Sequence, residues 1–92
     1  MRLADLPTSA VLLGRLRAGG DRDAATLFAT LYREPLLAFA QAKGFYAVDL
    51  EVAVHDTLRI ASERLPRGRY DPAKGRFRDW LVGILRNRLR MG

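Results

Sequence analysis

The chain of 92 residues has no cysteine, one histidine and no long apolar run. The absence of cysteine excludes disulfides, thiolate nucleophiles and thiolate metal sites, and it fits a reducing compartment. A single histidine excludes a multi-histidine metal site. The apolar stretch from Ser9 to Leu13 ends at Gly14 and Arg15, and it is too short for a signal-peptide core or a membrane span. We therefore expect a cytoplasmic protein without membrane insertion.

The features of common enzyme classes are also missing. A domain of this length hides about 60–65% of its unfolded surface, which allows a thin helical core and no deep cleft between two lobes. Gly14, Gly19 and Gly20 follow no strand pattern, so they do not form a phosphate-binding loop of a nucleotide enzyme. Glu51 and His55 lie one helical turn apart, but two ligands do not hold a metal ion. We expect no enzyme, no cofactor and no metal.

Charge is divided unevenly along the chain. Residues 1–58 carry six basic and seven acidic side chains, whereas residues 59–92 carry ten basic and three acidic ones. All but one of those ten are arginine, whose guanidinium binds phosphate in a fork and stacks on bases. This asymmetry favours a polyanionic partner. The alternative is a solvated, solubilising face.

Apolar residues recur three and four positions apart in four segments, which predicts four helices and no strand. The helices cover about 9–18, 21–43, 48–65 and 76–90, with Asp21 as an N-cap and Gly44 as a stop. Pro35 predicts a kink or a short break near Arg33 and Glu34. Residues 66–75 predict a basic loop. The fold class is thus all-α, a compact bundle of about four helices in one domain, 1–92.

The same spacing predicts the core. Its expected members are Leu12, Leu13, Leu16, Ala24, Leu27, Phe28, Leu31, Leu36, Phe39, Leu50, Val54, Leu58 (or Thr57), Ala61, Leu65, Phe77, Trp80, Leu81, Ile84 and Leu85.

Residues 67–90 interleave arginine with three aromatic rings. Single-stranded nucleic acid is bound by this combination, because cations follow the phosphates while rings stack on bases. We expect Phe77 in the core, Trp80 partly buried and Tyr70 exposed for stacking in the loop. Arg88 lies one turn beyond Ile84 and is expected to extend from the buried side. Residues 45–58, in contrast, hold three carboxylates and no lysine or arginine, which suits a basic protein partner.

Two stretches carry a family resemblance. The first is LLGRLRAGGDRDAATLFATLY, and the second is DLEVAVHDTLRIASERLPRGRYDPAKGRFRDWLVGILRNRLR. The ending YDP, Gly75, Phe77-Arg78, Trp80-Leu81, Ile84 and RNRL is specific. Over about residues 11–90 the chain resembles region 2, the core promoter-recognition domain, of extracytoplasmic-function sigma factors in the sigma-70 family.

The resemblance implies a transcription initiation factor that binds core RNA polymerase and recognises and melts the promoter −10 element. The family's acidic helix docks on the clamp helices of the largest polymerase subunit, and the corresponding residues here are Asp49, Glu51, His55, Asp56 and Arg59. The loop and the last helix of the family bind the single-stranded non-template strand. The corresponding DNA-binding residues are Arg67, Arg69, Tyr70, Lys74, Arg76, Arg78, Trp80, Arg86, Asn87 and Arg90.

The chain departs from the family in two respects. Leu50-Glu51-Val52 stands where the family often has Ala-Glu-Asp, and His55 stands where glutamine is usual. The second, −35-binding helix-turn-helix domain of full-length members is absent from these 92 residues. These departures motivate an alternative, a sigma-like regulatory protein that binds polymerase or an anti-sigma factor without opening promoters.

Overall fold

The computed structural model describes residues 10–45 and 50–91, and of residues 90 and 91 the backbone only. Within these ranges the chain forms four α-helices and a 3₁₀ turn, and it contains no strand. The all-α bundle is confirmed. No helix in the described ranges is long and apolar enough to cross a bilayer. The elements are α1 (Ala10–Ala18), α2 (Arg22–Ala42), α3 (Leu50–Arg64), η2 (Leu65–Arg67) and α4 (Phe77–Met91).

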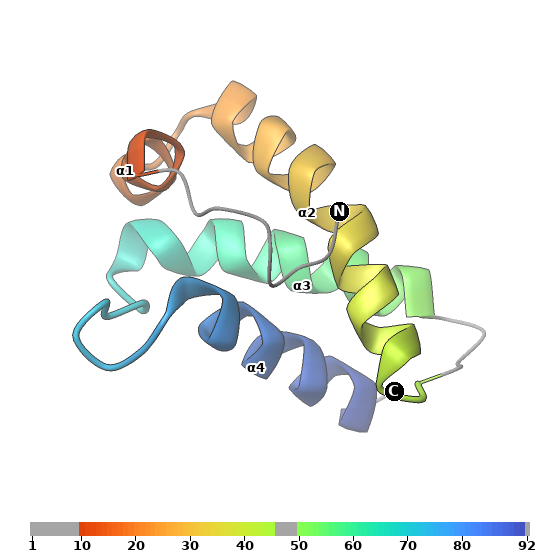
Figure 1. The fold of residues 1–92 in the computed structure, drawn as a ribbon. Coiled ribbons are helices and arrows are strands. Elements are labelled where there is room, and N and C mark those ends of the chain that lie inside the picture. Colours follow the sequence, from red (N-terminus) through yellow and green to blue (C-terminus); the bar gives the residue numbers. More distant parts are fainter. Residues whose placement is uncertain (1–9, 46–49, 92) are drawn as a thin grey trace.

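Helix α3 packs against both α2 and α4 (Figure 1), while α1 lies near η2 and the start of α2. The buried stripe of α3 is the expected one, and Val54 and Ala61 are fully buried. The stripe of α4 is also confirmed, since Leu81 and Leu85 are buried and Trp80 is half-buried. One core therefore joins the three long helices.

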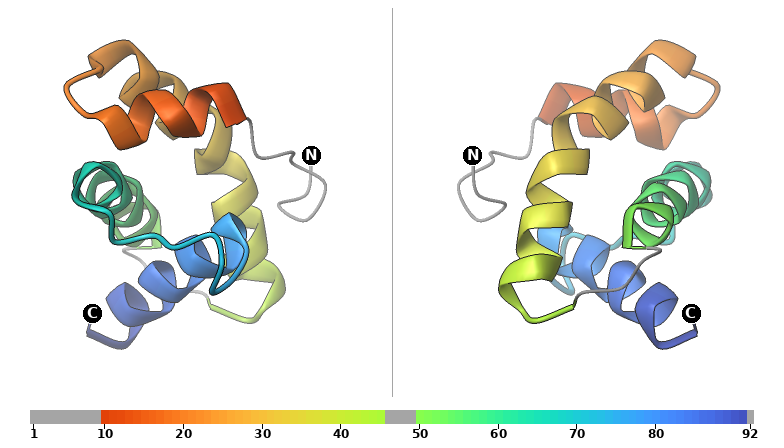
Figure 2. Two further views of the ribbon diagram at one scale, coloured as in Figure 1. Left: turned by 90° about the vertical axis from the view of Figure 1, so that its left-hand side faces the viewer. Right: turned by 90° about the vertical axis from the view of Figure 1, so that its right-hand side faces the viewer.

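Helix α2 begins as the sequence predicts, because the Asp21 carboxylate accepts a hydrogen bond from the Ala24 amide at 2.9 Å. It continues through Pro35 without a break, and Figure 2 shows it changing direction between its orange and its yellow-green halves. Proline removes one backbone hydrogen bond and crowds the preceding turn, so a bent but unbroken helix is the milder of the two expected outcomes.

The expected burial of Leu27 and Leu31 is wrong. Both are exposed, by 45% and 41%, while Tyr32 and Leu37 are buried instead. Apolar side chains surround much of α2, so several arcs of its surface satisfy the helical period. The arc that contains Phe28 and Tyr32 is the buried one, and both rings lie 5.9 Å from the Phe77 ring of α4, measured between centroids.

The junction of α1 and α2 is held by an ion pair. The Arg15 guanidinium donates to both oxygens of the Asp21 carboxylate, at 2.7 and 3.1 Å. These hydrogen bonds, with that of the Ala24 amide, lower the pKa of Asp21 below its ordinary value. The same carboxylate thus caps α2 and ties it to α1.

Candidate nucleic-acid interface

Residues 65–67 form η2, so the basic loop expected at 66–75 covers residues 68–76 in the structure, where it connects η2 to α4. It begins at a tight helix stop. Gly68 has a φ of 68° and a ψ of 25°, the left-handed conformation that glycine adopts most readily. Its amide donates to the Leu65 carbonyl at 3.2 Å, and the Arg69 amide donates to the Arg64 carbonyl at 3.3 Å. This pair of bonds is the Schellman motif, which turns the chain away from the helix axis. The backbone of Arg69 is therefore held in a fixed position where the chain leaves η2.

A turn follows at Asp71-Pro72-Ala73-Lys74. The Lys74 amide donates to the Asp71 carbonyl at 3.0 Å, and the Asp71 carboxylate accepts from the Ala73 amide at 2.9 Å. Aspartate at the first position and proline at the second are the residues that favour such a turn, because proline fixes φ and the carboxylate bonds to the backbone two residues on. The Asp71 carboxylate, the acidic group of the loop, is thus engaged in a hydrogen bond within the turn.

Tyr70 corrects an expectation. It is only 7% exposed, so the prediction of an exposed stacking ring in the loop is wrong for this structure. Its ring lies 5.4 Å from those of Phe77 and Trp80, measured between centroids, and its hydroxyl donates to the Gly75 carbonyl at 3.1 Å. Tyr70 therefore anchors the loop to the start of α4. Loop composition favours exposure, but the neighbouring rings of α4 provide a place for the side chain to be buried.

The loop borders an open pocket of about 510 Å³, hereafter the loop pocket. Its volume falls within the range of about 300–1,000 Å³ that is typical of small-ligand sites. Five of the predicted DNA-binding residues meet here, and three of them are cationic. The lining residues are Gly68, Arg69, Tyr70, Asp71, Lys74, Gly75, Arg76 and Trp80.

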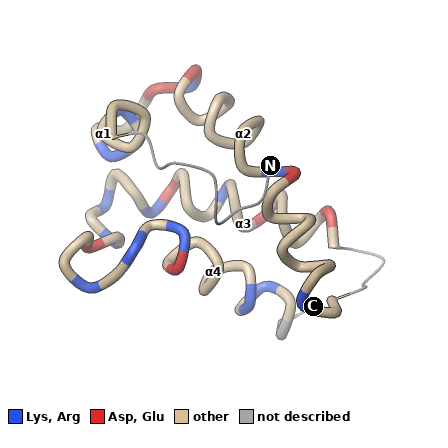
Figure 3. The backbone as a smooth tube through the Cα atoms, in the orientation of Figure 1, with Lys and Arg blue, Asp and Glu red and all other residues tan. Residues whose placement is uncertain are grey.

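The cationic side chains of this region are mostly without acidic partners. Among residues 10–45 and 50–89, Arg67, Arg69, Lys74, Arg76 and Arg86 form no ion pair. All five are exposed. Figure 3 shows lysine and arginine recurring along the loop and on α4. Unpaired guanidinium groups next to a pocket can bind phosphate without first breaking an internal contact.

A second pocket of about 350 Å³ lies between the end of α2 and the middle of α4. It contains Arg78 and Arg86 of the predicted set. It also contains two side chains that the sequence did not indicate as functional, Lys43 and Phe39, because Lys43 stands outside the basic half of the chain. Its full lining is Phe39, Lys43, Arg78, Asp79, Val82, Gly83 and Arg86.

The other predicted DNA-binding residues lie outside both pockets. Arg67 is exposed on η2, and Asn87 is exposed one turn beyond Gly83 on α4. The side chain of Arg90 lies outside the described residues. Arg88 is half-buried, as expected, and reaches α3 instead of the open face of α4.

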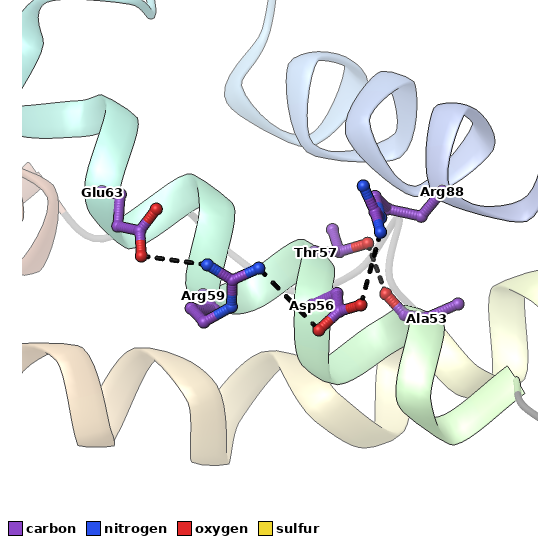
Figure 4. A network of polar contacts seen from close by, with 6 residues as sticks. All are labelled: Ala53, Asp56, Thr57, Arg59, Glu63 and Arg88. Atoms are coloured by element: carbon purple, nitrogen blue, oxygen red, sulfur yellow. Dashed lines mark hydrogen bonds and ion pairs between the residues drawn. The ribbon is translucent and has the colours of Figure 1, made fainter. Parts of the chain in front are cut away.

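Three of the expected polymerase-binding residues, Glu51, Asp56 and Arg59, take part in internal ion pairs. Figure 4 shows Asp56 between Arg59 of the same helix, at 4.0 Å, and Arg88 of α4, at 3.6 Å. Arg59 also donates to Glu63 at 3.0 Å. The Arg88 Nε atom is buried and has no hydrogen-bond partner among the described residues. Asp56 therefore helps to hold α4 against α3.

The start of α3 is linked to α2 in the same way, since Arg33 donates to the Glu51 carboxylate at 2.9 Å. Both side chains remain largely accessible, and so does His55. Asp49 lies outside the described residues. Within the described residues, no group of three or more histidine or acidic side chains is placed to hold a metal ion. The outer face of α3, formed by exposed residues, thus presents charges that are paired at Glu51, Arg59 and Glu63. Its members are Glu51, Val52, His55, Arg59 and Glu63.

The chain was compared with protein-family models, with curated proteins and with solved structures, and none of them matches it.

Proposed function

We propose that this domain binds single-stranded nucleic acid, with one base in the loop pocket and the adjoining phosphates on the arginines around it. One observation carries the proposal: Arg69, Lys74 and Arg76 surround the loop pocket without acidic partners in the described residues. Trp80 adds a half-buried ring to the same pocket. Cations that follow a backbone and rings that stack on bases are the two requirements for binding a single strand.

The rigidity of the loop supports the same function. The Gly68 stop, the Asp71–Lys74 turn and the Tyr70 hydroxyl fix the pocket at three points before any ligand binds. A preformed pocket loses less conformational entropy on binding than a disordered loop. Extruding a base from a duplex costs a few kcal/mol, and a preformed site can offset that cost.

The more specific proposal is that the strand is the non-template strand of a promoter −10 element and that the domain acts with core RNA polymerase. It rests on the resemblance of residues 11–90 to region 2 of extracytoplasmic-function sigma factors. The polymerase contact is proposed for the outer face of α3, where Val52 is 59% exposed between charged neighbours. An exposed aliphatic side chain among charges suits a protein interface with an apolar centre.

The alternative regulatory function has one observation in its favour. Glu51 and Asp56 are engaged with Arg33, Arg59 and Arg88, so a basic partner must compete with internal arginines for them. A partner that binds α3 without promoter opening is compatible with this neutralised face. Promoter-specific transcription by the domain with core polymerase contradicts the alternative.

Binding to labelled oligonucleotides tests the proposal. We expect a single strand to bind more tightly than the duplex of the same sequence, measured by fluorescence anisotropy. Log K is expected to fall against log salt by about 0.7 for each phosphate contacted. Replacing Arg76 by alanine removes one contact and flattens that slope.

Arg22→Ala is the matched control, because Arg22 is also exposed and without an ion pair among the described residues, but lies at the start of α2. If log K has the same slope against log salt for wild type, Arg76→Ala and Arg22→Ala, the assignment of the loop pocket as the binding site is wrong. Absence of binding by wild type contradicts the function.

A further inference from the structure

The pocket between α2 and α4 offers a second cationic site outside the loop. We propose that it binds the phosphate and sugar of a nucleotide in the same strand whose base occupies the loop pocket, with Lys43 and Arg86 as the phosphate ligands and Gly83 as the point of closest approach. The inference rests on the proposed function and extends it to α2.

Charge selects an anionic occupant for this second pocket. Lys43 comes from the end of α2, and Arg78 and Arg86 come from α4, whereas Asp79 is the one carboxylate among the described lining residues. Lys43 and Arg86 are exposed, and neither forms an ion pair within the described residues. The Lys43 ammonium lies 5.7 Å from the centroid of the Phe39 ring. This contact holds the ammonium over the face of the Phe39 ring and leaves the opposite side of the ammonium available to a ligand.

Gly83 is the second, independent observation. It is exposed in the middle of α4, where glycine weakens a helix relative to alanine. The helix does not need glycine here, because outside its chain neighbours and its own helix backbone no atom lies within 4 Å of a Cβ added at this position, and its φ is not left-handed. A glycine that neither packing nor backbone conformation requires leaves the helix backbone open to a ligand.

The two pockets share one turn of α4. Trp80 lines the loop pocket and Gly83 lines the second pocket. Residues three apart on a helix are neighbours, with about 5–6 Å between Cβ positions. A strand that leaves the loop pocket past Trp80 therefore meets the helix surface at Gly83, where no side chain stands, before it reaches Lys43 and Arg86.

Lys43 and Gly83 allow a test that separates this inference from the loop site. The probes are a labelled dinucleotide and a longer single-stranded oligonucleotide of the same sequence context, titrated into the whole domain. We expect Lys43→Ala to weaken the longer oligonucleotide roughly threefold at moderate salt and to flatten its salt slope by about 0.7. Gly83→Gln should weaken it at least as much, because the new side chain lies in the path of the strand.

A stability measurement shows whether these losses arise from misfolding. Gly83→Gln should raise Tm, since glutamine favours helix over glycine. Dinucleotide binding should remain at the wild-type level in both variants. Arg22→Ala, at the opposite end of α2 from Lys43, is the charge-matched control and should lose neither affinity nor slope.

Each outcome decides a different claim. If Arg69→Ala weakens the longer oligonucleotide while Lys43→Ala and Gly83→Gln bind it like wild type, the second site is wrong and the loop site stands. If wild type binds neither probe, the proposed function is wrong and the second site falls with it. If Gly83→Gln lowers Tm, the strand-path explanation of this glycine is overturned.

Discussion

Two arginine-rich regions of this domain differ in how their charges are used. On α2 and α3, Arg33 and Arg59 each donate to a carboxylate within 3.0 Å. Around the basic loop, Arg69 and Arg76 are exposed and have no such partner among the described residues. Paired arginines contribute to the internal electrostatics of the bundle, whereas unpaired ones are available to a ligand. Unpaired cations beside the loop pocket, and not net charge alone, therefore locate the candidate interface.

The largest expected loss of stability comes from a substitution that releases the basic loop from α4. Tyr70→Ala deletes a buried ring that contacts Phe77 and Trp80. Large buried aromatic-to-alanine changes cost about 3–5 kcal/mol. Urea denaturation should show a loss of that size, and oligonucleotide binding should fall with it.

Tyr70→Phe is the matched control for the ring. It keeps the packing and removes only the hydrogen bond to the Gly75 carbonyl, which contributes about 0.5–1.5 kcal/mol. If Tyr70→Phe destabilises the protein as much as Tyr70→Ala does, ring packing does not anchor the loop.

The next largest effect comes from breaking the ion pair between α3 and α4. Asp56→Ala leaves Arg88 without its carboxylate between α3 and α4. Because the Asp56 and Arg88 side chains are 27% and 35% exposed, we expect a loss of about 1–2 kcal/mol, between the values for exposed and buried pairs. Thermal or urea unfolding measures it. Arg59→Ala removes the exposed partner of Asp56 and of Glu63 and should cost less, because exposed ion pairs contribute little. A reversed order would show that Arg88 is not held by Asp56.

The third prediction compares the removal of an unpaired arginine with the removal of a paired one. Arg69→Ala should weaken single-strand binding by roughly threefold at moderate salt, the effect of one lost phosphate contact. Arg33→Ala should leave binding unchanged, because Arg33 is paired with Glu51 at the start of α3 and does not line the loop pocket, which follows the end of α3. Anisotropy titrations of both variants check this. Equal losses would mean that overall positive charge, and not local pairing, determines affinity.

The smallest effect is a pH dependence at the start of α2. Arg15 lowers the pKa of Asp21 in the folded state. Since the folded pKa lies below the unfolded one, the stabilisation is present above the unfolded pKa and is lost as pH falls through the folded pKa. Asp21→Asn keeps an N-cap without the charge. The difference in Tm between wild type and this variant should therefore be largest near neutral pH and shrink below about pH 4. A difference that does not depend on pH would exclude the ion pair as its cause.

Helical period predicted most of the fold but not which side of α2 is buried. The stripes of α3 and α4 were correct because polar residues flank them on both sides. On α2, Leu27 and Leu31 satisfy the period as well as Phe28 does, and only the positions of the neighbouring helices decide between them. The bend at Pro35 followed from its chemistry, whereas its severity depended on packing.

The candidate site was predictable where it is local in sequence. The loop pocket joins Arg69, Lys74, Arg76 and Trp80, which lie within one short segment. Lys43 could not be found in this way, because the fold brings the end of α2 to the middle of α4. The Arg33–Glu51 pair, 18 positions apart, is invisible to sequence patterns for the same reason.

The most direct test uses Trp80, the one tryptophan in the chain, which lines the loop pocket. Its emission can be followed while a labelled single-stranded oligonucleotide is titrated and its anisotropy is measured in the same sample. A base in the loop pocket predicts a saturable change in Trp80 emission with the same Kd as the anisotropy change. Binding by anisotropy with unchanged Trp80 emission, or no binding at all, would contradict the loop pocket as the nucleic-acid site.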